Sequence, residues 1–423
     1  MAYMVRLHWD PEDDSAIPRF DRRGCDYDAY VPDRLADRAF VFRGDVAADI
    51  TDAESAIQRL DLEAASLVNS EGIARLLLRA EAVASSRIEG LEVGSRRLLH
   101  AEIARSLGDE ARDVTAEEIL GNISAMAWAT EALGGSAEVT VADILEVHRR
   151  LTAGTRLADQ GGLVRDRQNW IGGSSYNPCR AQFVPPPPGA VTPLLEDLCA
   201  FCNQDELPAI AQAAIAHAQF ETIHPFVDGN GRTGRALIHV ILRRRGVATS
   251  VLPPISLVLS TWSDDYVNGL TRTRHLGSPH ENAAQEGIND WVALFAAATR
   301  RAVDDARLYE DRIAELQRRW RAQLRHVRRG SAVDLLLGML PGMPVVTVGT
   351  AAAAIRRSFQ ATNAAVAKLE QNGILRSVRV GRRNRAFETP ELIDAFNDLE
   401  RRLASPQGDT NIAPPARAVP RAR

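Results

Sequence analysis

The sequence predicts a mainly α protein with few β-strands, and three observations support this fold class. From about residue 54 onward, apolar residues recur at helical spacing over long segments; Ile73, Leu76, Leu77 and Ala80 share one face of such a segment. Strand patterns are sparse before residue 340. After residue 330, short helical segments precede an alternating run that is typical of a β-ribbon.

Composition limits the classes of protein that this chain can belong to. The 423 residues are 45% hydrophobic with a net charge of −4, so no overall charge draws the protein to nucleic acid or to a membrane surface. The first residues lack the pattern of a signal peptide, and no eighteen apolar residues run together. We therefore expect a cytoplasmic protein that makes no membrane contact.

Lysine and cysteine usage excludes further chemistry. Lys368 is the single lysine among 51 basic residues, which disfavours Schiff-base catalysis and a phosphate-binding loop of the lysine type. Cys25, Cys179, Cys199 and Cys202 are too few and too scattered for a disulfide framework, so a reducing compartment is expected. The last two form a CxxC without a second pair at zinc-finger spacing, and we interpret them as buried thiols.

The predicted elements follow one another in a simple order. Residues 1–60 mix proline, aspartate and arginine with short apolar runs, and we interpret them as an N-terminal lobe on the main body. Helical segments dominate residues 61–325. The main exception is "NWIGGSSYNPCRAQFVPPPP", residues 169–188, in which turn-forming residues separate two short apolar runs. This stretch predicts a hairpin or flap.

The stretch "HPFVDGNGRTGR", residues 224–235, joins two predicted helices through a glycine-containing loop. The N–H groups at the start of the second helix form an anion-binding site, which Gly229 and Gly231 allow a ligand to approach closely. Arg232 and Arg235 lie three residues apart in the first turn and can reach the same side. Two fixed cations beside free N–H groups suit a polyphosphate.

Two further residues of this stretch indicate the reaction. Asp228 would repel a phosphate unless it carried Mg²⁺, which proteins hold with one or two carboxylates together with phosphate oxygens. His224 ends the preceding helix, whose C-terminus favours the imidazolium form that a general base becomes after taking a proton. The set supports attack of a deprotonated hydroxyl on a nucleotide phosphate, which is nucleotidyl transfer.

The same stretch resembles the H-x-F-x-[DE]-G-N-G-R-x-x-R signature of the Fic family, and it matches at all eight specified positions. These positions are His224, Phe226, Asp228, Gly229, Asn230, Gly231, Arg232 and Arg235. Most members of that family transfer AMP from ATP to a Ser, Thr or Tyr hydroxyl of a target protein. The resemblance implies a Fic-type helical bundle that takes ATP, Mg²⁺ and a target protein.

The resemblance also implies a role for each residue of the signature. It makes His224 the base that deprotonates the target hydroxyl, makes Asp228 the Mg²⁺ ligand and turns Phe226 inward as core. The anion hole for the α- and β-phosphates is then formed by Gly229, Asn230 and Gly231. The β- and γ-phosphates are then held by Arg232 and Arg235.

The resemblance extends over roughly residues 30–310. Residues 162–188 are similar to the family's flap, on which a target segment lies as an added strand. Residues 254–274 are similar to a segment that helps to form the adenine pocket, where Tyr266 could contact the base. For Tyr266 the alternative is core packing, and we interpret His217 and His239 as structural histidines.

A second motif precedes the signature. "SSRIEG", residues 85–90, has Ser85, Glu89 and Gly90 in the pattern [ST]-x-x-x-E-[GN] at the end of a predicted helix around residues 71–90. By resemblance this is an inhibitory motif, in which Glu89 pairs with Arg235 and blocks the productive γ-phosphate position. The alternative is an ordinary exposed pair followed by a glycine that ends the helix.

Residues 330–400 show the layout of a winged helix-turn-helix, three short helices and then a ribbon. The helix Thr362–Gln371 could contact bases through Thr362, Asn363, Lys368 and Gln371, although these residues would equally suit a solvated face. Five arginines could contact DNA phosphates from the ribbon: Arg376, Arg379, Arg382, Arg383 and Arg385. Dimerisation or target binding is the alternative to DNA binding. Residues 401–423 are rich in Pro, Ala and Arg and predict a disordered tail.

The sequence therefore predicts a self-inhibited protein adenylyltransferase, with a homodimer left open. Two alternatives remain. The enzyme could remove AMP from modified proteins or transfer another phosphate-linked group. Otherwise the chain could be a DNA-binding regulator whose Fic domain senses nucleotide.

Overall fold

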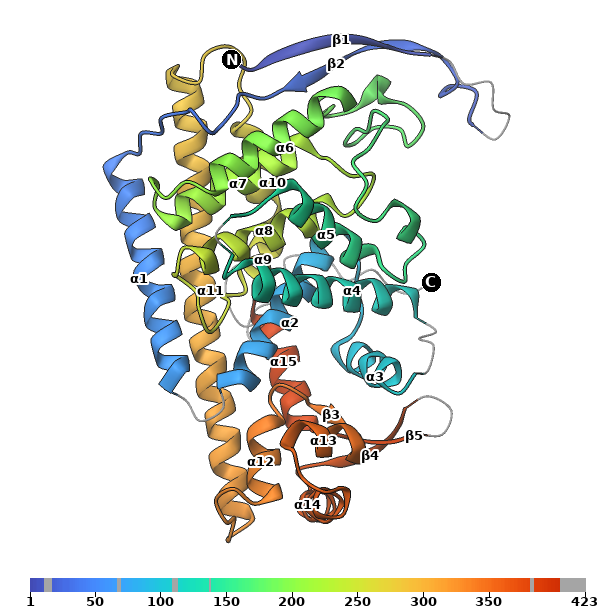
Figure 1. The fold of residues 1–423 in the computed structure, drawn as a ribbon, viewed down its shortest axis with the longest axis vertical. Coiled ribbons are helices and arrows are strands. Elements are labelled where there is room, and N and C mark those ends of the chain that lie inside the picture. The colour runs from blue at the N-terminus through green and yellow to red at the C-terminus, as the bar shows by residue number, and fades with distance from the viewer. Residues whose placement is uncertain (11–16, 67–69, 109–112, 137, 381–383, 404–423) are drawn as a thin grey trace. The chain divides into compact units, whose positions relative to one another are not determined.

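The computed structural model describes residues 1–10, 17–66, 70–108, 113–136, 138–380 and 384–403. The protein is mainly helical, as predicted, with small antiparallel sheets (Figure 1). It divides into two compact units, each assembled from separate segments. Unit 1 holds residues 1–54, 128–246 and 264–297, and unit 2 holds residues 55–127, 247–263 and 298 onward. The predicted tail, residues 401–423, falls almost entirely outside the described residues.

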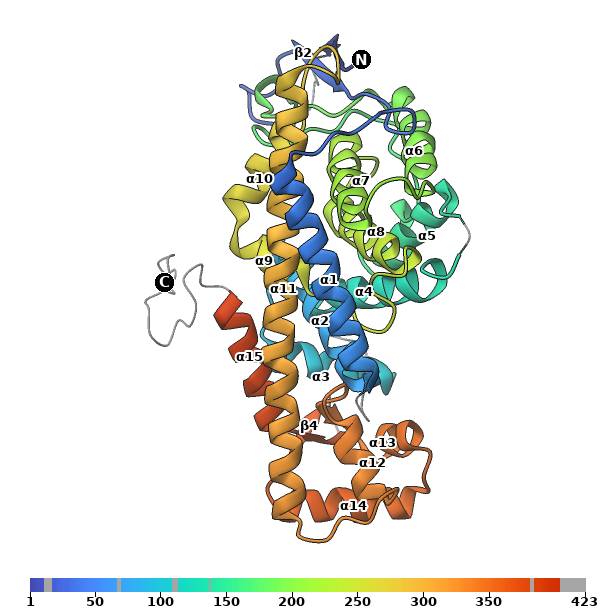
Figure 2. The same cartoon turned by 90° about the vertical axis from the view of Figure 1, so that its left-hand side faces the viewer.

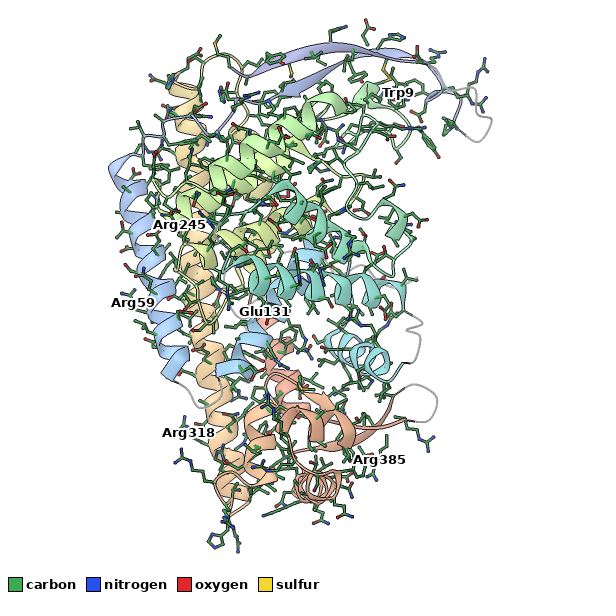
Figure 3. All side chains as sticks on the ribbon, in the orientation of Figure 1. Trp9, Arg59, Glu131, Arg245, Arg318 and Arg385 are labelled. Carbon is green, nitrogen blue, oxygen red and sulfur yellow. A yellow bond between two sulfur atoms is a disulfide. The ribbon has the colours of Figure 1, made fainter. Side chains whose placement is uncertain are left out.

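Unit 1 begins with a β-hairpin that the sequence analysis did not predict. Strand β1 (Tyr3–Trp9) pairs antiparallel with β2 (Cys25–Val31). Tyr27 and Ala29 of β2 are buried against Val184 of the flap. Trp9, which Figure 3 labels, packs edge-on against Trp170 with ring centroids 5.3 Å apart. The hairpin therefore packs on the flap.

The helices of unit 1 surround two central ones, α7 (Ala209–Ile223) and α8 (Asn230–Arg244), which lie side by side in Figures 1 and 2. All fifteen residues of α7 are buried, and its many alanines allow neighbouring helices to approach closely. The surrounding elements are η1 (Ala129–Leu133), α5 (Val141–Thr152), η2 (Ala158–Gln160), η3 (Pro178–Arg180), α6 (Pro188–Cys202) and α10 (Ser263–Arg272).

Helices α1 (Gly44–Ser66) and α11 (Asn282–Gln323) contribute residues to both units. The further helices of unit 2 are α2 (Ser70–Ile88), α3 (Ser95–Ser106), α4 (Val114–Trp128) and α9 (Ile255–Thr261). Every helix among the described residues is too short or too polar to cross a lipid bilayer.

The C-terminal part of unit 2 contains the three helices and the ribbon that the sequence predicts. The helices are α12 (Ala332–Met339), α13 (Val348–Ile355) and α14 (Phe359–Gln371), and α15 (Pro390–Leu403) follows the strands. The sheet has the order β3-β5-β4, formed by β3 (Val345–Val346), β4 (Arg376–Val380) and β5 (Asn384–Glu388). We call residues 332–399 the C-terminal module.

The cysteines correct one expectation and confirm another. Cys25 and Cys179 form a disulfide across 154 residues of sequence, because the start of β2 meets η3. The cysteines were expected to form no disulfide framework, but this bridge removes the cysteine argument for a reducing compartment. Cys199 and Cys202 are buried thiols, as predicted, and burial raises the pKa of Cys199 to about 12.

Candidate functional site

His224 ends α7 in a left-handed backbone conformation, with φ 50°. This conformation is uncommon for a residue other than glycine and persists only where its surroundings hold it. The carbonyl oxygen of His224 accepts hydrogen bonds from Arg165 Nε at 2.9 Å and from Asn169 Nδ2 at 3.2 Å. Its Nδ1 lies 4.0 Å from Glu221 Oε2. The flap thus fixes the backbone that carries the predicted base.

Arg165 joins the flap to the end of α7. Its backbone N–H donates to Pro225 O at 3.0 Å, and its buried guanidinium also donates to Pro186 O at 2.5 Å. Burial lowers its pKa to about 10, so the guanidinium stays charged at neutral pH. The flap forms the predicted hairpin, in which Ile171 N–H donates to Phe183 O at 2.8 Å.

Residues 225–231, which we call the nucleotide loop, are closed by a reciprocal pair of hydrogen bonds. Phe226 N–H donates to Asn230 Oδ1 at 2.8 Å, and Asn230 Nδ2 donates to Phe226 O at 2.8 Å. Because its side chain closes the loop, Asn230 offers a ligand its backbone N–H. Gly229 has φ 78°, and a Cβ there would lie 2.9 Å from Leu151 Cδ2. This position therefore requires glycine.

The start of α8 presents free backbone donors. The first backbone hydrogen bond into the helix runs from Thr233 N–H to Gly229 O, at 3.0 Å. The N–H groups of residues 230–232 precede this bond, and they remain available to a ligand together with the positive end of the helix dipole. These backbone groups would form the anion site that the sequence predicts.

Arg232 and Asp228 face each other at this site. Arg232 Nη2 lies 3.3 Å from Asp228 Oδ1, which also accepts the N–H of Gly229 at 2.5 Å. The Arg232 side chain is 6% exposed, whereas that of Asp228 is 47% exposed. Arg232 Nε is buried and has no hydrogen-bond partner among the described residues, which is a costly state for a charged donor. An anionic ligand beside it would lower this cost.

Asp228 fits the predicted Mg²⁺ only in combination with a ligand. Within the part of the chain that the structure describes, no group of three or more His, Cys, Asp or Glu side chains could hold a metal. A single half-exposed carboxylate suits Mg²⁺ that takes its remaining ligands from phosphate and water. The residues present therefore fit a nucleotide-bound Mg²⁺.

Arg235 is 1% exposed and lies in a buried polar cluster of unit 1. Its Nη1 donates to the hydroxyl of Tyr266 at 3.5 Å, and that hydroxyl is 2.8 Å from His217 Nε2. Burial, with Arg235 close by, lowers the pKa of His217 to about 3 and keeps the ring neutral. Tyr266 is 4% exposed and packs against Trp291, so its contacts support core packing, while an adenine contact stays a prediction.

His148 of α5 is a site residue that the sequence analysis missed. Its ring is 2% exposed and stacks on the ring of Phe226, with centroids 3.7 Å apart. Its Nδ1 accepts the N–H of Gly162 at 3.0 Å, so Nε2 carries the proton and donates to the carbonyl of Asp228 at 3.0 Å. Burial lowers its pKa to about 4. A lone histidine 80 residues from its partner leaves no signal in the sequence.

The predicted inhibitory motif lies in unit 2, at the end of α2. The N–H groups of Gly90 and Leu91 bond to Arg87 O at 2.9 Å and Ser86 O at 3.0 Å, with φ 79° at Gly90. This is a glycine-terminated helix end. Ser85 is fully buried while Glu89 is exposed just beyond the helix, so the pair is not the ordinary exposed pair of the alternative interpretation.

The C-terminal module offers fewer DNA contacts than the sequence predicted. Thr362 is 0% exposed and its hydroxyl donates to Ser358 O, so the predicted base contact by Thr362 is wrong because this side of α14 faces inward. Asn363 and Gln371 are exposed on α14, where Lys368 is half-buried.

The arginines of the ribbon are partly engaged within the module. Arg376 binds the buried carboxylate of Glu388, and Arg385, which Figure 3 labels, binds Glu370 at 3.1 Å. Arg379 is exposed, whereas Arg382 and Arg383 lie outside the described residues. DNA binding therefore stays a prediction.

Two family models match parts of this chain. Residues 138–242 match the family model described as Fic/DOC family, and residues 47–131 match the one described as Fic/DOC family N-terminal. Protein adenylyltransferase Fic of Drosophila willistoni is 37% identical over 139 residues, which are 32% of this chain and 26% of that protein. The protein of the same name from Drosophila melanogaster is 36% identical over 139 residues, with the same coverage.

A solved structure of a Fic family protein from Desulfovibrio desulfuricans G20 has a TM-score of 0.50 at 19% identity. The match covers 83% of this chain and 97% of that one, and it shows a shared fold. The matched region spans about a quarter of the length of the curated relatives.

Proposed function

We propose that this chain, a member of the Fic/DOC family by its residues 47–131 and 138–242, is a protein adenylyltransferase. It would transfer AMP from ATP to a Ser, Thr or Tyr hydroxyl of a target protein. One observation carries the proposal: the anion site at the start of α8 lies directly after a histidine whose backbone is locked at the end of α7. The name of the curated relatives supports the same reaction.

The anion site would hold the phosphates of ATP. The N–H groups of residues 230–232 would donate to the phosphate oxygens, Arg232 would add its buried Nε donor, and Arg235 would add a second guanidinium. Mg²⁺ held by Asp228 would neutralise charge on the phosphate oxygens. Tyr266 and His217 keep Arg235 in one orientation.

His224 would act as the general base. It takes the proton of the target hydroxyl, the hydroxyl oxygen bonds to the α-phosphorus, and the bond from that phosphorus to the leaving pyrophosphate oxygen breaks. Arg165 and Asn169 hold the His224 carbonyl, so the imidazole is presented from a fixed backbone. The products are the adenylylated protein and pyrophosphate.

The flap would bind the target, and Glu89 would restrain the reaction. An extended segment of the target can pair with the flap hairpin at Ile171–Phe183, which places a hydroxyl side chain toward the base. In the inhibitory role that the resemblance implies, Glu89 competes with the γ-phosphate for Arg235. A cytoplasmic location and a homodimer stay predictions.

ATP labelled at either the α- or the γ-phosphate tests the reaction. Wild-type protein and the Glu89→Gly variant are each incubated with one labelled ATP, Mg²⁺ and cell lysate, and label on protein is counted. We expect label from α-labelled ATP alone, with pyrophosphate released in equal amount and nothing in the presence of a chelator. Label from γ-labelled ATP would indicate phosphoryl transfer. Absence of label from both variants, with ATP binding intact, would contradict the proposal.

A further inference from the structure

We propose that His148 is a positioning residue for the nucleotide loop and that it connects this loop to the start of the flap. The expected effect on the reaction rate rests on the proposed function. The contacts of His148 do not depend on it. His148 lies on α5, one turn before Leu151, and both side chains lie beneath the nucleotide loop.

The contacts of His148 leave its ring one orientation. One nitrogen bonds to the N–H of Gly162, where the flap segment begins, and the other bonds to the carbonyl of Asp228. The ring face lies on Phe226 at an interplanar angle of 5°. The donor and the ring face are therefore satisfied by the nucleotide loop and the acceptor by the flap, so the histidine links α5, the flap and the loop.

The bond to Asp228 decides how that residue faces a ligand. Its carbonyl accepts a hydrogen bond from the buried His148 Nε2, while its carboxylate side chain is 47% exposed. Without this bond the peptide that follows Asp228 can rotate, which moves the carboxylate and the N–H of Gly229 together. His148 thus holds in place the group that would carry Mg²⁺.

Two substitutions separate the hydrogen bonds from the packing. His148→Phe keeps an aromatic ring on Phe226 but removes both hydrogen bonds, whereas His148→Gln keeps a donor and an acceptor. In His148→Phe we expect amide exchange of residues 225–231 and 161–165 to accelerate about tenfold or more, with other regions unchanged. We expect the KM for Mg²⁺–ATP to rise and kcat to fall, together by about ten- to a hundredfold. His148→Gln should recover most of both.

Amide exchange keeps this test independent of the transfer reaction. Unchanged exchange in the loop and the flap of His148→Phe would overturn the inference. So would exchange that rises equally throughout unit 1 in both variants, because that pattern indicates general destabilisation. If the Glu89→Gly protein transfers no label at all, the proposed function fails while the exchange result still decides the role of His148.

A different set of contacts, all within unit 2, carries a second inference. We infer that the C-terminal module holds the inhibitory segment, residues 85–94, in its restraining position and that its displacement releases the restraint. This inference also rests on the proposed function. The segment runs from the end of α2 to the start of α3, and both helices pack on the module.

The contact with α2 is a close approach of backbones. A Cβ on Gly342 would lie 2.9 Å from Gly72 Cα and 3.1 Å from Gly72 O, so this approach tolerates no side chain. Further along α2, Arg79 binds both carboxylate oxygens of Glu102 on α3, at 3.0 and 2.7 Å. The two helices that flank the inhibitory segment are therefore linked to each other as well.

The contact with α3 combines an apolar core with a buried charge. Leu99 and Ile103 pack with Val345, Val380 and other residues of the module. Beside them Glu388 is 0% exposed and accepts charge-assisted contacts from His100 at 3.2 Å, Arg96 at 3.3 Å and Arg376. Removing one partner of such a buried group is strongly unfavourable, so module and α3 move as one body.

Gly342→Val places a wedge between module and α2, and Gly349→Val is its matched control because a Cβ there meets only Thr347 Oγ1, at 3.7 Å. We expect Gly342→Val to raise labelling of target protein about tenfold when Glu89 is present. In the Glu89→Gly variant it should raise labelling no further. Gly349→Val should change neither. The inference would be overturned if Gly342→Val raised labelling equally with and without Glu89. It would also be overturned if Gly342→Val did not change labelling in a variant that thermal melting shows to be folded.

Should Gly342→Val fail to fold, Glu388→Gln tests the same coupling through α3 in the same two backgrounds. If Glu89→Gly itself does not raise labelling, the inhibitory role of Glu89 is wrong. A failure of this inference alone would leave the effect of Glu89→Gly intact.

Discussion

His224→Ala will reduce labelling of protein from α-labelled ATP by about a hundred- to ten-thousandfold, the range typical for loss of a general base. His224 follows α7 directly and precedes the anion site at the start of α8, and its backbone is held by Arg165 and Asn169. Without the imidazole, the target hydroxyl keeps its proton and attacks the α-phosphorus poorly. Binding of ATP, measured by calorimetry, should remain within a factor of a few because the anion site is intact.

The left-handed backbone of His224 requires its own control. Alanine tolerates φ 50° poorly, whereas asparagine visits this conformation readily. His224→Asn should therefore lose as much labelling as His224→Ala while it melts at the wild-type temperature. The exposed His326 serves as the matched control, and His326→Ala should leave labelling unchanged. Labelling by His224→Asn within tenfold of wild type would place the base elsewhere.

Glu89→Gly will raise labelling by about ten- to a hundredfold, which corresponds to the 1.5–3 kcal/mol of a hydrogen bond to a charged group. The physical reason is competition: a guanidinium that binds a carboxylate cannot also bind the γ-phosphate. Glu89 stands just beyond α2, exposed, behind the buried Ser85. Initial rates with α-labelled ATP, measured at several ATP concentrations, check the prediction.

Glu92→Gly is the matched control for this variant because Glu92 is an exposed acid of the same segment. It should leave labelling unchanged, so that any effect at residue 89 is specific to its carboxylate. A loss of activity in Glu89→Gly, together with faster removal of AMP by wild type from a modified protein, would instead support the reverse reaction. In that reaction Glu89 positions the attacking water.

The loop at residues 224–235 was predictable because its interactions are local. Asn230 closes the loop on Phe226, and Arg232 reaches Asp228, each across four residues. Contacts across four residues at the start of a helix follow from helix geometry. They can be expected without knowing how the rest of the chain folds. The flap hairpin was predictable for a similar reason, since its two runs are separated by turn-forming residues.

Several features that depend on tertiary packing were missed or left open by the sequence. The disulfide joins residues 154 apart, and a count of cysteines cannot show that β2 meets η3. Thr362 was expected to face solvent or DNA bases, but the packing of α14 turns this residue inward, which helical spacing alone does not determine. Tyr266 was open between two roles, and its contacts with Arg235 and His217 support packing.

The sequence by itself predicted the chemistry that we propose for this protein: a histidine, an acid and two arginines around a helix start, with hydrogen bonds between near neighbours. Tertiary structure alone decided what holds that chemistry in place. His148, Arg165 and Asn169 reach the loop from 55 to 80 residues away, through backbone carbonyls that any sequence possesses. Because a backbone carbonyl is the same in every residue, a contact with it does not constrain which residue type provides the carbonyl. Such contacts are therefore visible only in the folded structure.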